Sequence, residues 1–396
     1  MKDLFEKCSQ GKSARAKQAI EEGWYPYFMA IESGADTTVT IRGEKKIMIG
    51  SNNYLGLTQH PRVIKAAKDA IDRFGSGCTG SRFLNGTLTI HEELEERLAD
   101  FMQKEAALVF STGFQTNQGV ISTLVGRKDM SVGDAENHAS IVEGTRLAFG
   151  KSLKYRHNDM NDLQRVLARN ADDGGILIIT DGVFSMGGDI VKLPELVKIA
   201  QKYHARIMVD DAHAVGVLGK TGAGTAEHFG LIDQVDLTMG TFSKSFASLG
   251  GFIVGTHEVI HHIKHNARAL IFSASPPPAA VATVIACLDI LQEEPERVER
   301  LRQIGQKMRD GYRALGFNTG HSETPIIPII IGEDEKTFLF WRMLYENGVL
   351  CNPVVSPAVP PGMALLRTSY MANHTDEELD QVLEIFSRVG KKYGII

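Results

Sequence analysis

The chain has 396 residues, 43% of them hydrophobic and 23% charged, and a formal net charge of -5. These values are ordinary for a globular protein, and the negative charge argues against a nucleic-acid-binding protein. The four cysteines include no CxxC pair, so we expect reduced thiols and neither a disulfide framework nor a zinc site. The first residues lack the apolar core of a signal peptide, and no apolar run is long enough to span a membrane. We therefore expect a cytoplasmic protein, and peripheral contact of an amphipathic N-terminal helix with a membrane stays open.

The N-terminal part of the chain predicts a helix, a hairpin and a second helix. Residues 1–30 favour a polar helix followed by an aromatic patch, and the alternating residues 37–50 favour a β-hairpin. Pro61 can begin a helix whose apolar face ends at Gly75. The stretch GSGCTG (75–80) matches a dinucleotide-binding pattern in form only, because a helix precedes it where a strand is required. We interpret it as a mobile glycine loop near a ligand.

Between about residues 90 and 255, short β-branched runs alternate with helical segments. This alternation predicts a mostly parallel sheet wrapped in helices, in which ligands bind outside the carboxyl ends of the strands. Polar residues follow the predicted strands directly, so we expect a site along that edge. The predicted strands are 106–110, 176–180, 205–209 and 237–239, and the polar segments after them are 111–115, 181–185, 210–213 and 241–244.

Lys244 is the residue around which we expect the site to form. It has no charged neighbour in its loop, and a lysine in such a loop can have a lowered pKa and form a Schiff base. Gly113 precedes a predicted helix N-terminus, which suits a phosphate. Asp210 could pair with a buried cation, and His138 and His213 could stack on a flat ring or donate hydrogen bonds to it. Each feature alone has an ordinary structural explanation, but together they indicate pyridoxal phosphate, which needs a lysine, a pyridinium partner and a phosphate site.

The C-terminal part predicts a small α/β domain that brings Arg367 to the site. A guanidinium matches a carboxylate, and Arg367 is the charged residue of an otherwise apolar and hydroxylated run. Three histidines of a predicted helix (257–271) lack an acidic partner, so we expect no metal site there. The other predicted elements are a helix at 298–315, a strand at 325–331, a helix at 338–346, a non-helical proline-rich loop at 352–362 and a last helix with a capping box of Thr375 and Glu378. The predicted division is 1–46 for an N-terminal helix and hairpin, 47–282 for a large domain and 283–396 for a small domain.

Several motifs resemble those of the α-oxoamine synthases, a family of pyridoxal-phosphate enzymes with the type I aminotransferase fold. The resemblance extends over nearly the whole chain, and it implies a large domain with a mostly parallel sheet plus a smaller C-terminal α/β domain. Within the family, GSGCTGSRFLNGT, GTFSKSFASLGGF, FSAS and NPVVSPAVP are most similar to the bacterial serine palmitoyltransferases. The family motifs are SNNYLGL (51–57), GSRFLNGT (80–87), FSTGFQTN (110–117), DAENHASI (134–141), DGVFSMGGD (181–189), VDDAHAVG (209–216), GTFSKS (240–245) and LLRTSYMANHT (365–375).

The resemblance implies a role for each candidate residue. Lys244 would hold the cofactor covalently, and Asp210 would pair with its pyridine nitrogen. His213 would contact the ring hydroxyl, and His138 would stack on the ring and touch the substrate. The remaining implied ligands are Gly113, Phe114, Thr241 and Ser273 of the partner subunit for the phosphate, and Arg367 for the amino-acid carboxylate, with Asn52 and Ser185 assisting and Ser185 also bordering the cofactor.

The implied reaction is a decarboxylative condensation of an amino acid with a long-chain acyl thioester in a homodimer with shared active sites. Serine and palmitoyl-CoA would give 3-ketodihydrosphingosine, the first step of sphingolipid synthesis. Cysteate with acyl-CoA or an acyl carrier protein, as in sulfonolipid synthesis, and glycine with a short acyl group, as in glycine C-acetyltransferase, stay open. An aminotransferase without a thioester substrate is a further rival. A non-catalytic partner subunit is disfavoured, because Lys244, Asp210, His138 and Arg367 are all intact.

Overall fold

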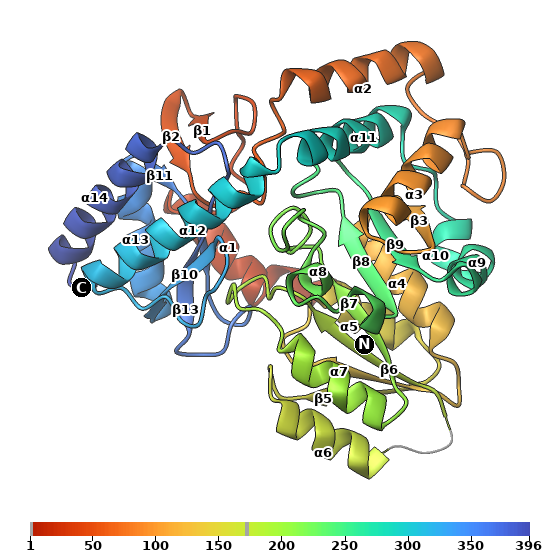
Figure 1. The fold of residues 1–396 in the computed structure, drawn as a ribbon. Helices are drawn as coiled ribbons and strands as arrows, with labels where there is room; N and C mark the ends of the chain where they lie inside the picture. The colour runs from red at the N-terminus through yellow and green to blue at the C-terminus, as the bar shows by residue number, and fades with distance from the viewer. Residues whose placement is uncertain (1–2, 171–173) are drawn as a thin grey trace.

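A seven-stranded sheet forms the centre of the larger part of the molecule. The computed structural model describes residues 3–170 and 174–396, and a smaller α/β part lies beside this sheet (Figure 1). The strands are β3 (Ala106–Phe110), β4 (Met130–Asp134), β5 (Lys151–Tyr155), β6 (Ile176–Asp181), β7 (Arg206–Asp210), β8 (Leu237–Thr241) and β9 (Gly251–Gly255). Their spatial order is β3-β9-β8-β7-β6-β4-β5, and the pairs are parallel except for the two that involve β9. The predicted mostly parallel α/β fold is confirmed, although β4, β5 and β9 were not predicted as separate strands.

Helices cover both faces of this sheet, because alternate strand residues point to opposite sides. On β6, Ile178 packs with Leu163, whereas its neighbour Ile179 packs with Val120 on the other face. The helices of this part are α2 (Pro61–Phe74), α3 (Thr89–Phe101), α4 (Gly113–Leu124), α5 (Ala139–Leu147), α6 (Met160–Asn170), α7 (Leu193–Lys202), α8 (Thr225–His228), α9 (His257–Asn266), α10 (Arg268–Ile271) and α11 (Pro278–Glu293), with a short 3-10 helix, η2 (Ile232–Gln234). The sheet is therefore buried on both sides, and its strand ends are left to form a site.

The smaller part combines about the last quarter of the chain, from α12 onward, with an N-terminal hairpin. The helices η1 (Glu6–Ser9) and α1 (Lys12–Glu21) precede the hairpin in the chain. The elements of the smaller part are β1 (Thr38–Ile41), β2 (Glu44–Met48), α12 (Glu296–Leu315), β10 (Ile326–Gly332), α13 (Asp334–Glu346), β11 (Val349–Leu350), β12 (Asn352–Val354), β13 (Ala364–Ser369) and α14 (Asp376–Lys392). One antiparallel sheet has the order β10-β13-β12, and a second has the order β1-β2-β11, with β11 parallel to β2. The N-terminal hairpin thus pairs with a C-terminal strand, although about 300 residues separate them in sequence.

These pairings bear on the predicted domain boundaries. A boundary at 282–283 would cut α11, which is one continuous helix that packs on α2. A separate segment 1–46 would divide β2 from its pairing with β11. We therefore propose that the small domain comprises the β1–β2 hairpin and the chain from α12 onward. Residues 1 and 2 of the predicted N-terminal segment lie outside the described residues.

Local predictions had mixed outcomes. The predicted helix at 257–271 is wrong as one element, since Ala267 separates α9 from α10. The proline-rich stretch was predicted to be a loop, but its first residues form β12. Pro353 is tolerated there because β12 is an edge strand. A residue without a backbone N–H loses no interstrand hydrogen bond on the side of an edge strand that has no neighbouring strand. The capping box of Thr375 and Glu378 at the start of α14 is confirmed. In the part of the chain that the structure describes, no helix combines the length and apolar character needed to cross a bilayer.

Candidate active site

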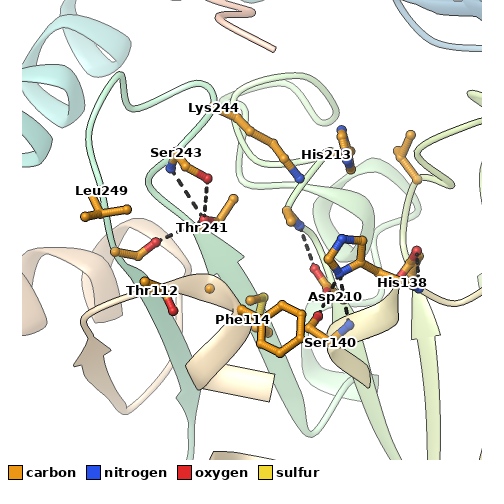
Figure 2. A pocket seen from close by; sticks show the side chains of 16 residues that line it. Thr112, Phe114, His138, Ser140, Asp210, His213, Thr241, Ser243, Lys244 and Leu249 are labelled. Atoms are coloured by element: carbon orange, nitrogen blue, oxygen red, sulfur yellow. Dashed lines mark hydrogen bonds between the residues drawn. The ribbon is translucent and has the colours of Figure 1, made fainter. Parts of the chain in front are cut away.

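The loops after five strands meet in one pocket of about 250 Å³ at the carboxyl edge of the large sheet (Figure 2). Such a volume lies near the lower end of the range for small-molecule and cofactor sites. The lining residues come from the loops after β3, β4, β6, β7 and β8: Thr112, Gly113, Phe114, His138, Ser140, Asp181, Val183, Asp210, Ala212, His213, Met239, Thr241, Ser243, Lys244, Leu249 and Gly250. The predicted convergence of strand ends is confirmed, and β4 adds a segment.

The pocket gathers most of the sequence-predicted site residues but not all of them. Gly113, Phe114, His138, Asp210, His213, Thr241 and Lys244 line it. Asn52, Ser185 and Arg367 form an adjoining hydrogen-bonded group, described below, and Ser273 lies apart from its own chain's pocket lining. Sequence reasoning gave no role to Tyr54, Asn117, Ser140 or Asp181, which the structure places in contact with the predicted residues.

Lys244 follows β8 and projects into the pocket (Figure 2). Burial of the ammonium group lowers its pKa to about 8, with Asp210 opposing this shift and Arg367 adding to it. An amine with such a pKa is partly uncharged near neutral pH. Lys244 can therefore act as a nucleophile towards an aldehyde or as a base, which an ordinary surface lysine does poorly.

Asp210 and Asp181 end neighbouring strands and lie close together in this buried region. The Asp210 carboxylate accepts hydrogen bonds from the Asn117 side chain (2.7 Å) and from the backbone N–H of Ala212 (3.0 Å). Burial, together with the charge of Asp210, raises the pKa of Asp181 well above its usual range. Asp181 is therefore the carboxyl group that tends to be neutral, and Asp210, which faces two hydrogen-bond donors, is the candidate partner for a bound cation.

His138 begins α5 as its N-cap residue. Its Nδ1 lies 2.7 Å from Ser140 Oγ, and its ring lies edge-on to Phe114 with 6.4 Å between the centroids. Partial burial lowers the pKa of its imidazole, so the ring is mostly neutral at pH 7. A neutral, anchored imidazole at the pocket wall suits contact with a flat cofactor ring.

Tyr54 links His213 to the adjoining hydrogen-bonded group of Asn52, Ser185 and Arg367. The Tyr54 hydroxyl lies 2.6 Å from His213 Nδ1 and 3.3 Å from Asn52 Oδ1. Burial of His213 lowers the pKa of its imidazole well below the usual range, and the charges of Lys244 and Arg367 add to this effect. His213 is therefore a neutral hydrogen-bonding group. The signal that could have found Tyr54 is its place in the SNNYLGL motif beside Asn52.

Arg367 lies on β13 of the small domain and is only 5% exposed. Its Nε donates to the backbone oxygen of Ser185 (2.6 Å), and an Nη donates to Asn52 Oδ1 (3.0 Å). Among the described residues no carboxylate forms an ion pair with this guanidinium. A buried charge without a counter-charge is costly, so this arrangement fits a site that receives a carboxylate from a ligand.

A close backbone approach lies beside the N-terminus of α4. Thr112 is the N-cap of this helix and accepts the backbone N–H of Gln115. A Cβ on Gly113 would come within 2.8 Å of Thr241 Oγ1, so a larger residue would fill the space between helix and loop. Helix N–H groups and hydroxyls without an intervening side chain form a suitable cradle for a phosphate. Lys244 and Asp210 line the same pocket, so the residues present fit pyridoxal phosphate.

Ser273 follows α10 and accepts a hydrogen bond from Gln115 Nε2 (3.1 Å) of the same chain. The neighbouring carbonyl of Ala274 accepts the Ser111 hydroxyl. Ser273 thus lies next to the start of α4 but outside the pocket of its own chain. Its predicted action from a partner subunit stays a prediction.

Comparison with known proteins agrees with this geometry. A family model described as aminotransferase class I and II matches residues 44–386. The chain is 54% identical over 374 residues to the serine palmitoyltransferase of Sphingobacterium spiritivorum, with 94% of each sequence covered. It is also 44% identical over 383 residues to the 8-amino-7-oxononanoate synthase of Treponema denticola, with 96% of this chain and 97% of the relative covered.

Solved structures give the same relationship. The structure of SPT with a PLP internal aldimine matches with a TM-score of 0.96 and 37% identity, covering 100% of both chains. The 8-amino-7-oxononanoate synthase of Francisella tularensis matches with a TM-score of 0.76 and 27% identity, covering 89% of this chain and 99% of that one. The cofactor of this protein is therefore pyridoxal phosphate, and the protein is an acyltransferase. The chain belongs to the class I and II aminotransferase family and, within it, to the α-oxoamine synthases.

Proposed function

We propose that this enzyme condenses L-serine with a long-chain acyl thioester, palmitoyl-CoA, to give 3-ketodihydrosphingosine, CoA and carbon dioxide. The observation that carries the choice of an amino-acid substrate is the buried guanidinium of Arg367, which has only neutral partners among the described residues. Support for serine and palmitoyl-CoA comes from two relatives named serine palmitoyltransferase, at 54% and 51% identity. The second of these is from Bacteriovorax stolpii.

In this proposal Arg367 binds the serine carboxylate through its planar fork, and Asn52 holds the fork in place. Pyridoxal phosphate supplies the electron sink that stabilises negative charge on the serine α-carbon. Asp210 would pair with the pyridine nitrogen of that cofactor, and Gly113, Phe114 and Thr241 would surround its phosphate.

Lys244 is the base that removes the α-proton, since burial lowers its pKa to about 8. The α-carbon then bonds to the thioester carbonyl carbon, and the CoA sulfur leaves as a thiol. The carboxylate held by Arg367 leaves as carbon dioxide, and a proton replaces it at the α-carbon. The net reaction consumes one proton from solution.

We further propose a homodimer with shared active sites. Large apolar side chains project from two adjoining loops, with Phe83 54%, Leu84 77% and Phe272 78% exposed. A bridge between Ser81 and Ala274 joins these loops. Such a patch beside the pocket is typical of an interface, and burying it against a second copy would bring Ser273 of the partner subunit to the phosphate cradle. Analytical ultracentrifugation of wild type and of Leu84→Asp tests this: a dimer is expected for the first and dissociation for the second, and a monomeric wild type would contradict it.

We propose a cytoplasmic location with peripheral contact to a membrane through the N-terminal segment. Leu4, Phe5 and Phe28 are 68%, 71% and 96% exposed there. Deletion of residues 1–30 should abolish sedimentation with liposomes while the remaining protein keeps its fold by circular dichroism. Wild type that stays in the supernatant would exclude membrane contact.

The decisive experiment measures thiol release by the cofactor-loaded enzyme with paired substrates. Serine, cysteate, glycine and alanine are each supplied with palmitoyl-CoA, with palmitoyl carrier protein, and with the short thioesters acetyl-CoA and pimeloyl-CoA. We expect the highest kcat/KM for serine with palmitoyl-CoA. Preference for cysteate would assign sulfonolipid synthesis, and preference for alanine with pimeloyl-CoA would assign the activity named for the Treponema denticola relative. No thiol release with any pair would contradict the condensation itself.

A further inference from the structure

One buried amide joins two of the proposed active-site residues. Asn117 lies on α4, one turn after Gly113, and its side chain is inaccessible to solvent. Its Nδ2 donates to Asp210 Oδ2 (2.7 Å) and to Ser140 Oγ (2.8 Å). Ser140 Oγ in turn lies 2.7 Å from His138 Nδ1, and Figure 2 shows these side chains along one wall of the pocket. A continuous chain of hydrogen bonds therefore connects Asp210 with His138.

The chemistry of the partners determines which atom of the Asn117 amide is the nitrogen. A carboxylate only accepts hydrogen bonds, so the group that faces Asp210 must be the NH₂ and not the oxygen. The two amide protons are then both used, one on Asp210 and one on Ser140. The amide oxygen accepts no hydrogen bond from the described residues. Leaving a buried acceptor without a partner costs free energy, which indicates that the two donated bonds determine the orientation.

This orientation determines the direction of the next bond. The Ser140 hydroxyl already accepts from Asn117, so its single proton is available for His138 Nδ1. The backbone N–H of Ser140 also points at Nδ1, at 3.3 Å. With two donors facing it, Nδ1 must be the unprotonated nitrogen of the neutral ring. The proton of the His138 imidazole then resides on Nε2.

We propose that Asn117 is a positioning residue that holds the Asp210 carboxylate for the cofactor and, through Ser140, holds His138 as its Nε2–H tautomer. The inference rests on the roles proposed above for Asp210 and His138, but not on which amino acid or thioester is used. A positioning role for Asn117 can be told apart from a packing role, because it affects Asp210 and His138 through two different hydrogen bonds. Loss of Asn117 removes a bond to each residue's network, whereas loss of the Ser140 hydroxyl removes the bond to His138 and leaves the bond from Asn117 to Asp210 in place.

The first measurement is cofactor affinity, by titrating apoprotein with pyridoxal phosphate and following intrinsic fluorescence. Asn117→Ala removes one charge-assisted bond to Asp210 and should raise the dissociation constant about tenfold. Asn117→Asp keeps the shape but brings a carboxyl group against Asp210, so it should raise the constant further. Ser140→Ala should raise it less than Asn117→Ala does, because the bond from Asn117 to Asp210 remains. Asp210→Ala serves as the reference: if that variant binds the cofactor as tightly as wild type, the proposed role of Asp210 fails, and the role of Asn117 towards Asp210 fails with it.

The second measurement is the His138 tautomer in the apoprotein, from two-bond ¹H–¹⁵N correlations of histidine-labelled protein, with His138→Gln to assign the signal. Wild type should show the Nε2–H pattern, and both Ser140→Ala and Asn117→Ala should show a shift towards a mixture of tautomers. Thr116→Val is the matched control, because Thr116 is equally buried in the same turn and its hydroxyl donates to the backbone oxygen of Thr112, the N-cap of α4, and not to Asp210 or Ser140. It should change neither quantity.

These readouts do not depend on turnover, so they stand even if the proposed substrates are wrong. If Asn117→Ala does not fold, Asn117→Asp still tests the Asp210 branch and Ser140→Ala still tests the His138 branch. Unchanged cofactor affinity in the folded Asn117 variants, or an unchanged His138 tautomer in Ser140→Ala, would overturn the proposal. An equal loss of affinity in Thr116→Val would likewise overturn it, because it would show a general effect of disturbing α4.

Discussion

The large sheet has one pocket at the amino ends of its strands, here called the amino edge, and one at their carboxyl ends, called the carboxyl edge. The two pockets differ in whether their charged groups have partners within the protein. The pocket at the amino edge is the larger one, at about 460 Å³ against about 250 Å³ at the carboxyl edge. At the amino edge, the Asp236 carboxylate accepts from Arg206 and from the backbone N–H of Ile207, and the Asp129 carboxylate accepts from two glycine N–H groups. At the carboxyl edge, Lys244 has a lowered pKa and the nearby Arg367 has no carboxylate partner among the described residues. The comparison teaches that incompletely satisfied ionisable groups, and not volume, distinguish the functional edge.

The largest expected effect is the loss of the amine at the carboxyl edge. Lys244→Ala should reduce thiol release at least about a thousandfold, because both covalent attachment of the cofactor and the base are removed. The measurement is the rate with serine and palmitoyl-CoA, together with the visible absorbance of the bound cofactor. A variant that keeps more than a tenth of the wild-type rate would contradict the role of Lys244 and weaken the distinction between the two edges.

The next effect concerns the fork of Arg367. Arg367→Lys keeps the charge but loses the bidentate geometry, and we expect kcat/KM for the amino acid to fall about a hundredfold. Most of this loss should appear in KM, because the carboxylate is held in the ground state as well. Arg367→Gln should be worse, since it also removes the charge. An unchanged KM in both variants would show that the substrate carboxylate binds elsewhere.

How far the sequence alone could predict this site is visible at two neighbouring positions of α4. Gly113 could be predicted, because a glycine just after a strand and at a helix start has a recognisable local signature. Asn117 closes the motif FSTGFQTN, but its role could not be predicted, because its partners Asp210 and Ser140 are distant in sequence. Local chemistry thus predicted the strand ends, but not the hydrogen bonds between them.

The same distinction explains the fold. The strand at 106–110 was predicted with its correct bounds, because its β-branched and apolar residues lie between clear helix signals. The β-hairpin at 37–50 was also predicted, but its pairing with β11 was not, since pairing over about 300 residues depends on tertiary packing. The break between α9 and α10 at Ala267 could not be predicted either, because no glycine or proline lies there.

A smaller effect, on stability, is expected at His157, a paired histidine that is not part of the carboxyl-edge pocket lining. His157 contacts Asp134 and Asp189 at 3.1 Å each and Glu136 at 3.8 Å. Burial alone would lower the pKa of this imidazole, but the hydrogen bonds to Asp134 and Asp189 outweigh burial and raise it to about 10. This cluster joins the end of β4 to the loops after β5 and β6, so it should stabilise the fold and not act in the chemistry.

Because the pKa of His157 is raised in the folded state, its stabilising effect is complete below the ordinary value of 6.5 and disappears as pH rises through about 10. We expect His157→Gln to lower the free energy of unfolding by about 2 kcal/mol at pH 7. The difference from wild type should shrink towards pH 10, as measured by urea denaturation. A difference that stays constant between pH 6 and pH 10 would show that the ring acts by packing on Phe184 and not by its charge.

The smallest effect is expected from a substitution at the amino edge, which serves as the control for the substitutions at the carboxyl edge. Arg206 is paired with Asp236, and its side chain is 78% exposed. An exposed ion pair contributes between 0 and about 1 kcal/mol, so Arg206→Ala should change the free energy of unfolding by no more than that. Asp236 keeps the backbone N–H of Ile207 as a donor, so no carboxylate is left without a partner. Thiol release should stay within twofold of wild type, because the amino ends of the strands are a full strand length from Lys244. If Arg206→Ala instead impaired turnover as strongly as Arg367→Lys, paired charges would be as functional as unpaired ones, and the larger pocket would have to be considered a second site.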